Sequence, residues 1–302
     1  MVSKQMKYVI KGLLYTRSIS IKNRVKEHRT GLEKMSSGLE LPEDVKSEYV
    51  DANGVQSALL IPPDIKNRRT ILFLHGGAYI AGSIKTSQYH AEYISRASNA
   101  QVLIVDYRLA PEYQFPAALE DAINAYRWLI DVKGIPHDEL IIVGVSAGGG
   151  LTIATLLKLR ALGMDMPKAA VCISPWVDLT FTGETFRERA KMDPFLTPDE
   201  LEFAANLYYG DADPRDPFIS PIYADLQRLP PLFIQAGTAE ILYDDAVHLA
   251  KNAEKAGVDV KLDIWEDMIH AFPVFVSVTP ESEKAIERIS KFIHEIFKNK
   301  AE

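Results

Sequence analysis

The chain has 302 residues, of which 47% are hydrophobic and 25% are charged. This composition is typical of a globular protein with a sizeable core, and it excludes disordered, collagen-like and coiled-coil chains. Basic residues number 34 and acidic residues 41, which leaves a net charge of −7. Nucleic acid is therefore excluded as the main partner, because phosphate binding requires a basic face. The single cysteine, Cys172, can form no internal disulfide, and its apolar neighbours predict a buried side chain.

The first 20 residues do not have the pattern of a membrane anchor or a signal peptide. No apolar run approaches membrane-spanning length. The apolar stretch in residues 1–20 is interrupted by Lys4, Lys7, Lys11 and Arg17, whereas a signal peptide keeps its apolar core uncharged. We therefore expect a cytoplasmic protein without stable membrane insertion.

Residues 1–30 form a basic segment, which contains eight lysines and arginines but only one acidic residue, Glu27. Apolar residues recur in and near this segment at roughly helical spacing; they are Met6, Val9, Ile10, Leu13, Leu14, Ile21 and Val25. One interpretation is a cationic amphipathic helix that touches a membrane surface. The favoured interpretation is a helix that docks its apolar stripe on the main domain, because most such helices pack in this way.

After residue 42 short apolar runs alternate with amphipathic stretches. Asn53-Gly54, between residues 49–50 and 55–61, predicts a β-hairpin. The apolar runs that predict strands are 70–74, 101–105, 140–145, 169–173, 232–235 and 258–265. The stretches that predict helices are 87–98, 116–131, 149–162 and 241–255. Buried strands separated by helices predict an α/β fold, with a mostly parallel sheet covered on both faces.

One long stretch, from Asp178 to about Leu229, contains no apolar strand and interrupts this alternation. Its one predicted helix covers residues 198–209. An insertion of this length is usually functional, for instance as a lid. Its aromatic residues, with Trp176 just before it, predict an apolar pocket beneath the lid; they are Phe181, Phe186, Phe195, Phe203, Tyr208 and Tyr209.

Gly144-Val145-Ser146-Ala147-Gly148 matches G-x-S-x-G and stands between a predicted strand and a predicted helix. In that context the glycines permit a sharp turn that lifts the Ser146 hydroxyl above the sheet. The dipole of the following helix favours negative charge that develops beside it. The alternative is a serine that caps the helix, with glycines for close packing, and the strand–turn–helix context disfavours it.

His75-Gly76-Gly77-Ala78 follows the predicted strand 70–74. Small residues at Gly76, Gly77 and Ala78 let a loop expose consecutive backbone N–H groups. With the N–H of Ala147, such donors would form an oxyanion hole. The alternative is a plain β-turn.

A serine nucleophile on this kind of sheet is followed in the chain by an acid and then by a histidine. Three histidines follow Ser146, and His248 and His294 lie within predicted helices. His270 instead follows the last predicted strand. Because α/β sheets place their ligands at the carboxyl ends of strands, His270 is the candidate base.

The candidate acid is Glu240, which lies in the loop after the predicted strand 232–235. Asp244 is the alternative, although it and Asp245 have the positions of first-turn acids in the next helix. A metal site on Asp244, Asp245 and His248 is a further alternative. It is disfavoured, because exposed charges on a helix usually face solvent.

The charged run from Asp106 to Glu112 also follows a predicted strand. We interpret it as structural rather than catalytic. Arg108 is expected to pair with Asp106 or Glu112 and so to brace the neighbouring loops.

Taken together, these motifs resemble the hormone-sensitive lipase family of α/β-hydrolase carboxylesterases, especially its bacterial members. The resemblance extends from about Ser47 to Phe297. The segments that carry it are His75-Gly76-Gly77-Ala78-Tyr79, Asp106-Tyr107-Arg108-Leu109-Ala110-Pro111-Glu112, residues 144–149, Ser174-Pro175-Trp176 and Met268-Ile269-His270-Ala271-Phe272.

The resemblance implies that Ser146 is the nucleophile, His270 the base and Glu240 the acid. It implies that Gly77, Ala78 and Ala147 supply the oxyanion donors. It also implies a helical cap, formed by residues 1–45 and by an insertion at about 178–229, over a catalytic domain of residues 46–302.

The sequence departs from the family pattern at three positions. Ala78 stands where the family has a fourth glycine, so the backbone there is less free. Val145 stands where the family often has a polar residue, and any hydrogen bond from that side chain is lost. Glu240 stands where aspartate is commoner, and a glutamate can do the same work. No reacting group is missing.

The implied activity is hydrolysis of short- to medium-chain carboxylic esters through an acyl-enzyme, with no metal or organic cofactor. The expected partner is a small-molecule ester, with an acyl optimum near butanoyl to hexanoyl, and a homodimer is left open. An amidase or deacetylase is the alternative, because the same triad serves both reactions. A non-catalytic small-molecule receptor of this fold is disfavoured, since His270 is present with the serine and the acid.

Overall fold

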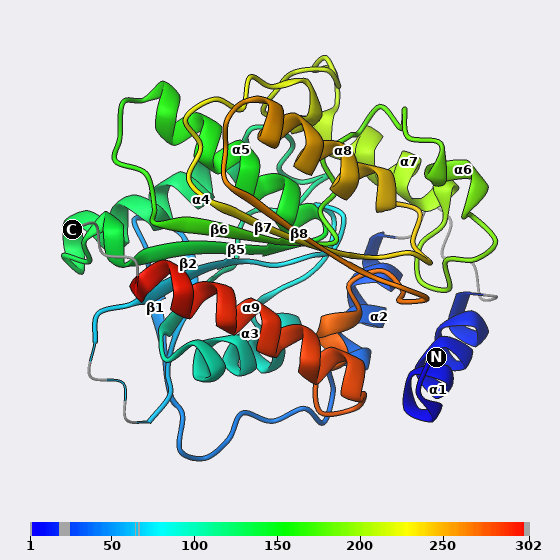
Figure 1. The fold of residues 1–302 in the computed structure, drawn as a ribbon, viewed down its shortest axis with the longest axis horizontal. Coiled ribbons are helices and arrows are strands. Elements are labelled where there is room, and N and C mark those ends of the chain that lie inside the picture. The colour runs from blue at the N-terminus through cyan, green and yellow to red at the C-terminus, as the bar shows by residue number, and fades with distance from the viewer. Residues whose placement is uncertain (1, 18–24, 64, 66, 299–302) are drawn as a thin grey trace.

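An eight-stranded sheet forms the centre of the computed structural model, which describes residues 2–17, 25–63, 65 and 67–298 (Figure 1). The strand order is β1-β2-β4-β3-β5-β6-β7-β8. β2 pairs antiparallel with β1 and β4, and the other neighbours are parallel. The strands are β1 (Lys46–Asp51), β2 (Gln56–Ile61), β3 (Thr70–Leu74), β4 (Gln101–Val105), β5 (Leu140–Val145), β6 (Ala169–Ile173), β7 (Leu232–Gly237) and β8 (Val260–Trp265). This mostly parallel sheet confirms the α/β fold that the sequence predicted.

Helices cover both faces of the sheet (Figure 1). α3 (Ile84–Ser98) and α9 (Pro280–Lys298) pack on one face. α4 (Ala117–Arg127), α5 (Ala147–Ala161) and α8 (Tyr243–Lys255) pack on the other. Because both faces are covered, every residue of β3, β5 and β6 is buried. Short helical turns join these elements: η1 (Trp128–Val132), η2 (His137–Glu139), η3 (Pro221–Tyr223) and η4 (Phe272–Phe275).

The parallel register brings the carboxyl ends of the central strands to one edge of the sheet. Leu74 at the end of β3 lies opposite Gly144 of β5, which in turn lies opposite Cys172 of β6. The loops that follow these strands therefore leave the sheet close together, at the edge where α/β proteins bind ligands. Cys172 is fully buried, as its apolar neighbours predicted.

Four helices stand beyond this edge of the sheet (Figure 1). They are α1 (Lys4–Arg17), α2 (Val25–Met35), α6 (Thr185–Glu188) and α7 (Pro198–Tyr209). α7 has the bounds that the sequence predicted for the helix of the insertion. It begins there because Thr197 accepts a hydrogen bond from the Glu200 N–H as a cap, and Pro198 occupies the first turn.

α1 docks on the main domain through part of its apolar stripe, as favoured from the sequence, but Leu14 of that stripe is exposed and Val25 lies on α2. Met6 and Leu13 are buried in a cluster with Met268, Ile269 and Phe272, which flank His270 in the chain. Ile21, assigned to the same stripe, lies outside the described residues. Among the residues that the structure describes, no helix combines the length and the apolar character needed to cross a bilayer.

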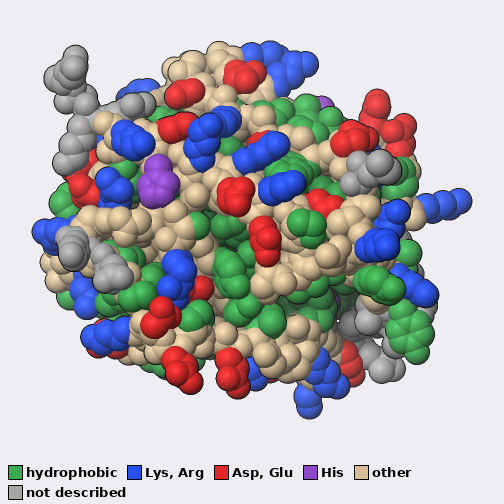
Figure 2. All heavy atoms as spheres, turned by 60° about the horizontal axis from the view of Figure 1, so that its bottom comes forward, with side chains coloured by type: hydrophobic (Ala, Val, Ile, Leu, Met, Phe, Trp, Pro, Cys, Tyr) green, Lys and Arg blue, Asp and Glu red, His purple; other side chains and the backbone are tan. Residues whose placement is uncertain are grey.

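Charges of both signs are interspersed over the face that carries α3 and α9. Figure 2 shows lysines and arginines next to aspartates and glutamates there, with hydrophobic side chains between them. This face therefore lacks, among the described residues, the continuous basic patch that a nucleic acid would require.

Candidate active site

Ser146 occupies a strained turn between β5 and α5. Its backbone angles are φ 57° and ψ −119°, a region that non-glycine residues rarely adopt. The turn is tight because Gly148 passes close to the end of β3, and a Cβ at Gly148 would lie 2.0 Å from the Leu74 carbonyl oxygen. This is the sharp strand-to-helix turn that G-x-S-x-G predicted, with Ser146 at the N-terminus of α5.

His270 and Glu240 lie beside Ser146, so the structure brings together the three candidate residues. The Nε2 atom of His270 is 3.0 Å from Ser146 Oγ, and its Nδ1 atom is 2.7 Å from Glu240 Oε2. All three residues are buried. They come from the loops after β5, β7 and β8, which leave the same edge of the sheet. Each histidine nitrogen therefore has one partner, in the order carboxylate, imidazole, hydroxyl.

Ser174 connects Glu240 to the loop that carries His270. Its hydroxyl donates to Glu240 Oε1 at 2.9 Å and accepts from the Ala271 N–H at 3.0 Å. Glu240 Oε1 also accepts from the Gly237 N–H at 2.7 Å. This contact was not predicted from the sequence, in which Ser174 stood only as part of the Ser174-Pro175-Trp176 motif, although its place just after β6 was a signal.

Asp193 is a second buried carboxylate beside the histidine. Its Oδ1 accepts from the N–H groups of Phe195 and Leu196, at 2.8 and 2.9 Å, and its Oδ2 accepts from the Ile241 N–H at 3.0 Å. Burial raises the pKa of Asp193, whereas the nearby His270 lowers it. The Phe195 ring stacks on the His270 imidazole with ring centres 5.9 Å apart. Asp193 thus ties the insertion to the loop that carries Glu240, which the sequence did not predict.

Asp244 and Asp245 stand in the first turn of α8, as predicted, and neither of them contacts His270. Asp244 Oδ2 accepts from the Thr185 N–H at 2.9 Å. Asp245 is buried and accepts from the Val177 and Asp178 N–H groups at 2.8 and 2.9 Å. The burial raises the pKa of Asp245. These side chains therefore hold the start of the insertion, and no cluster of three metal-ligating residues occurs within the described part of the chain.

The loop after β3 lies against Ser146. A Cβ at Gly76 would lie 3.3 Å from the Ser146 Cβ. Gly77 has φ 126°, and a Cβ there would lie 2.1 Å from the Ala81 carbonyl oxygen, so only glycine fits. Ala78 has φ 54°, a left-handed conformation that costs an alanine about 1 kcal/mol or more.

His75 holds this loop from beneath. Burial lowers the pKa of His75 to about 4, so the ring is neutral at neutral pH. Its Nδ1 lies 2.8 Å from the Gly76 carbonyl oxygen, and its ring stacks on Tyr107 with centres 4.0 Å apart. The Tyr107 hydroxyl donates to the His75 carbonyl oxygen at 2.7 Å.

The predicted pairing of Arg108 is wrong. Arg108 binds Asp121 and Glu120 of α4 rather than Asp106 or Glu112. These acids lie one helical turn into α4, which packs beside the loop that carries Arg108. How α4 packs against this loop could not be predicted from local spacing. Its role is nevertheless structural, as expected.

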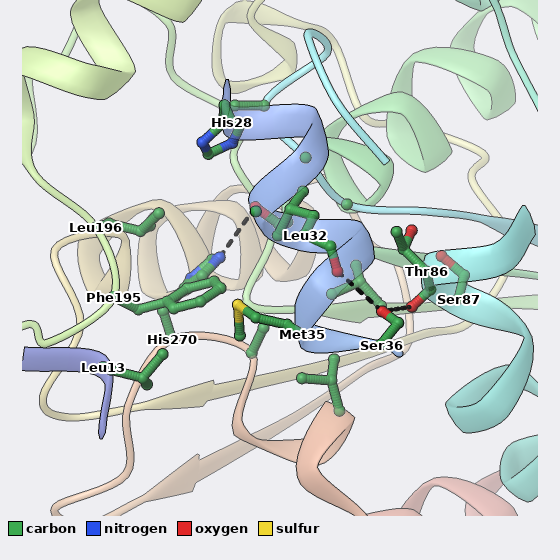
Figure 3. Close-up of a pocket in the computed structure, with 18 of the residues that line it drawn as sticks. Leu13, His28, Leu32, Met35, Ser36, Thr86, Ser87, Phe195, Leu196 and His270 are labelled. Carbon is green, nitrogen blue, oxygen red and sulfur yellow. Dashed lines mark hydrogen bonds between the residues drawn. The ribbon is translucent and has the colours of Figure 1, made fainter. Parts of the chain in front are cut away.

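A cavity of about 330 Å³ lies next to Ser146 and His270 (Figure 3). Much of its lining comes from outside the sheet: α2 provides Val25, His28, Gly31, Leu32 and Met35, and the insertion provides Pro194, Phe195, Leu196, Glu200, Leu201, Phe203 and Ala204. The lining is mainly apolar, as predicted. The cavity can therefore hold an apolar substrate against the serine hydroxyl.

The prediction for the aromatic residues is only partly right. Phe195 and Phe203 line the cavity. The others pack away from it: they are Trp176, Phe181, Phe186, Tyr208 and Tyr209. Tyr208, for example, stacks on Tyr79 with ring centres 3.8 Å apart. The aromatic residues thus indicated that the insertion is well packed, but they did not indicate which of its side chains line the cavity.

A serine, a histidine and a carboxylate joined at the carboxyl edge of a parallel sheet define an α/β hydrolase. The family model described as the alpha/beta hydrolase fold matches residues 71–274, and the chain belongs to this family. It is 41% identical over 233 residues to an acetyl-hydrolase of Streptomyces hygroscopicus. The aligned region covers 77% of this chain and 78% of that protein.

Solved structures agree with this assignment. An esterase from the bacterial hormone-sensitive lipase family has a TM-score of 0.94 and 40% identity, covering 98% of this chain and 99% of its own. The esterase EstE5, in a crystal soaked with p-nitrophenyl butyrate, has a TM-score of 0.92 and 39% identity over the same shares. The chain is accordingly a carboxylic ester hydrolase of the hormone-sensitive lipase type.

Proposed function

We propose that the chain is a serine carboxylesterase that hydrolyses short- to medium-chain esters through Ser146, His270 and Glu240. The observation that carries the proposal is the hydrogen-bonded series from Glu240 through His270 to Ser146, which ends on a hydroxyl beside a largely apolar cavity. Such a series converts a weak nucleophile into an effective one.

Acylation begins when Ser146 Oγ attacks the ester carbonyl and His270 Nε2 takes its proton. The carbonyl oxygen becomes an oxyanion, which accepts hydrogen bonds from the N–H groups of the Gly76–Ala78 loop and of Ala147. The C–O bond to the alcohol then breaks, and His270 gives its proton to the departing oxygen. The acyl group remains on Ser146 as an ester.

Deacylation repeats these steps with water as the nucleophile. His270 takes a proton from the water as it attacks the acyl carbonyl, and it returns a proton to Ser146 Oγ when the acid departs. Glu240 keeps Nδ1 protonated and stabilises the imidazolium that forms in each half of the reaction. The proton of Ser146 thus goes to the departing alcohol, and a proton of the attacking water goes back to Ser146.

Residues 1–45 and the insertion at about 178–229 serve as a cap over the catalytic domain of residues 46–302. The support is that α2 and residues 194–204 supply the outer lining of the cavity. Asp244 and Asp245 hold the start of the insertion on that domain. In this proposal the loops that follow the strands carry the reacting groups, and the cap determines the shape of the pocket.

The acyl preference follows from the size and character of the cavity. Each methylene of the acyl chain that is buried in the cavity adds about 0.8 kcal/mol of favourable transfer free energy, until the cavity of about 330 Å³ is full. The similar proteins named above, an acetyl-hydrolase and an esterase soaked with a butyrate ester, support short chains.

A panel of 4-nitrophenyl esters from acetyl to palmitoyl tests this proposal, with the 4-nitroanilides of the same acids alongside. We expect kcat/KM to be highest near butanoyl to hexanoyl and to fall steeply for palmitoyl. Faster cleavage of the anilides than of the esters would instead identify an amidase. A rate that jumps when triglyceride passes its solubility limit would identify a lipase.

A further inference from the structure

Two polar side chains from different segments belong to the outer lining of the cavity. His28 comes from α2 and Glu200 from α7, and both belong to the cavity lining. Their neighbours in that lining are apolar, among them Leu32, Leu196 and Leu201. Figure 3 shows His28 on the first turns of α2, with its ring directed to the side on which Leu196 and His270 lie. At this end of the cavity, two polar side chains are therefore surrounded by mainly apolar lining residues.

The His28 ring has no hydrogen-bond partner among the described residues, and Glu200 is the charged group that acts on it electrostatically. Glu200 Oε2 accepts from the Thr197 hydroxyl at 2.8 Å, and no described residue donates to its Oε1. At the α3 end of the cavity, Ser36 and Tyr89 have partners, whereas Nε2 of His90 is buried without one among the described residues. An imidazole and one carboxyl oxygen are thus left without protein partners beside a substrate cavity.

The protonation of His28 decides what these atoms can bind. Burial lowers the pKa of His28 more than the Glu200 carboxylate raises it. The ring is accordingly neutral at neutral pH, with one N–H donor and one acceptor nitrogen. A hydroxyl group complements the pair, because it can donate to Glu200 Oε1 and accept from the His28 N–H. An alkyl group at the same place would leave both side chains without partners, which is costly.

We propose that His28 and Glu200 form a polar subsite that binds a hydroxyl group of the substrate, so that hydroxy esters are a preferred substrate class. The proposal rests on the proposed esterase function and adds a specificity to the same cavity. Neither side chain contacts Ser146 Oγ or takes part in the proton transfers. They are specificity-determining residues, and their effect is on the choice between esters.

Isosteric pairs of esters measure this effect, because a hydroxyl replaces a methyl group without a change in length. Ethyl 6-hydroxyhexanoate is compared with ethyl heptanoate, which places the hydroxyl on the acyl chain. The ester of butanoic acid with 1,4-butanediol is compared with pentyl butanoate, which places it on the alcohol. Acid release is followed by titration, and the result is the ratio of kcat/KM for the hydroxyl member to that for the methyl member.

His28→Leu and Glu200→Met remove the polar atoms while they keep much of the side-chain volume. Glu202→Met is the matched control, since Glu202 is exposed on the same helix and is not part of the cavity lining. Both esters of a pair are measured on one preparation, so a loss of folded enzyme cancels from the ratio.

We expect each of the two cavity variants to lower the ratio about tenfold in at least one pair, as expected for a lost hydrogen bond in a partly buried site. Glu202→Met should leave the ratio within twofold of the unmodified protein. A ratio that stays within twofold in both pairs for either cavity variant overturns the subsite. A protein that hydrolyses none of the four esters contradicts the esterase function itself, which is a different failure.

Discussion

The floor and the roof of the cavity are built in different ways. The floor, formed by residues 76–78, Ser146 and His270, comes from loops that leave the buried sheet, and Ser146 and His270 are only 7% and 1% exposed. The roof, formed by α2 and residues 194–204, lies beyond the sheet, and no residue of α2 is fully buried. The floor therefore holds the atoms that are proposed to react, and among the described residues only Phe195 of the roof stacks on one of the floor side chains, His270.

The two regions also differ in how they are held. Several hydrogen bonds between buried groups join the floor, among them those of Glu240 and Ser174. Arg29 of α2 donates to the Ile80 and Ala110 carbonyl oxygens and pairs with Glu112 at 2.6 Å, so α2 is held in part through partly exposed groups. Changes in the floor should thus reduce kcat, whereas changes in the roof should act on KM and on substrate choice.

The largest effect is expected from the floor, for Glu240→Gln. His270 would lose the carboxylate that orients it and stabilises its imidazolium, so kcat should fall by about three to four orders of magnitude. The control is Asp244→Asn, which alters a carboxyl that binds the insertion instead. Steady-state kinetics on folded protein, checked by circular dichroism, measure both. A larger loss for Asp244→Asn would show that the acid has been assigned wrongly.

Ser174→Ala tests the connection beneath the triad. The variant removes a hydroxyl that donates to Glu240 and accepts from the Ala271 N–H, so both floor loops lose a partner. We expect kcat to fall about tenfold with little change in KM, because one or two buried hydrogen bonds are lost. Ser174→Thr should recover part of the rate. An unchanged kcat in Ser174→Ala would mean that the floor is held without this bridge.

The smallest effect is expected from the roof, for Arg29→Ala. Loss of its contacts to Ile80 and Glu112 should loosen α2 and raise KM for hexanoyl esters about threefold, with kcat nearly unchanged, which corresponds to less than 1 kcal/mol. Lys26→Ala, an exposed change on the same helix, should have no effect. If kcat fell in Arg29→Ala as much as in Ser174→Ala, roof and floor would not be separable.

The sequence predicted the floor better than the roof. Periodicity located β3, β4 and β6 at the observed residues, because buried strands are simple apolar runs. The order of residues along the chain selected His270 and Glu240, which the structure joins to Ser146. The triad roles themselves stay predictions until they are measured.

Contacts between distant segments could not be predicted in this way. Arg29 reaches residues 51 or more positions away, and Asp193 reaches Ile241 across 48 positions. The hydrogen bonds of Ser174 similarly span 66 and 97 positions. Local spacing carries no information on such pairs, since they depend on how the insertion and the N-terminal helices pack on the finished sheet.

Covalent labelling of Ser146 tests the central claim most directly. The protein is treated with diethyl 4-nitrophenyl phosphate, which reacts with an activated serine hydroxyl, and the modified peptide is identified by mass spectrometry. We expect loss of esterase activity in proportion to labelling, with the diethyl phosphate group on Ser146 alone and no labelling of the folded Ser146→Ala variant. Inactivation with Ser146 unmodified, or a label on another residue that accounts for it, would contradict the assignment of the nucleophile.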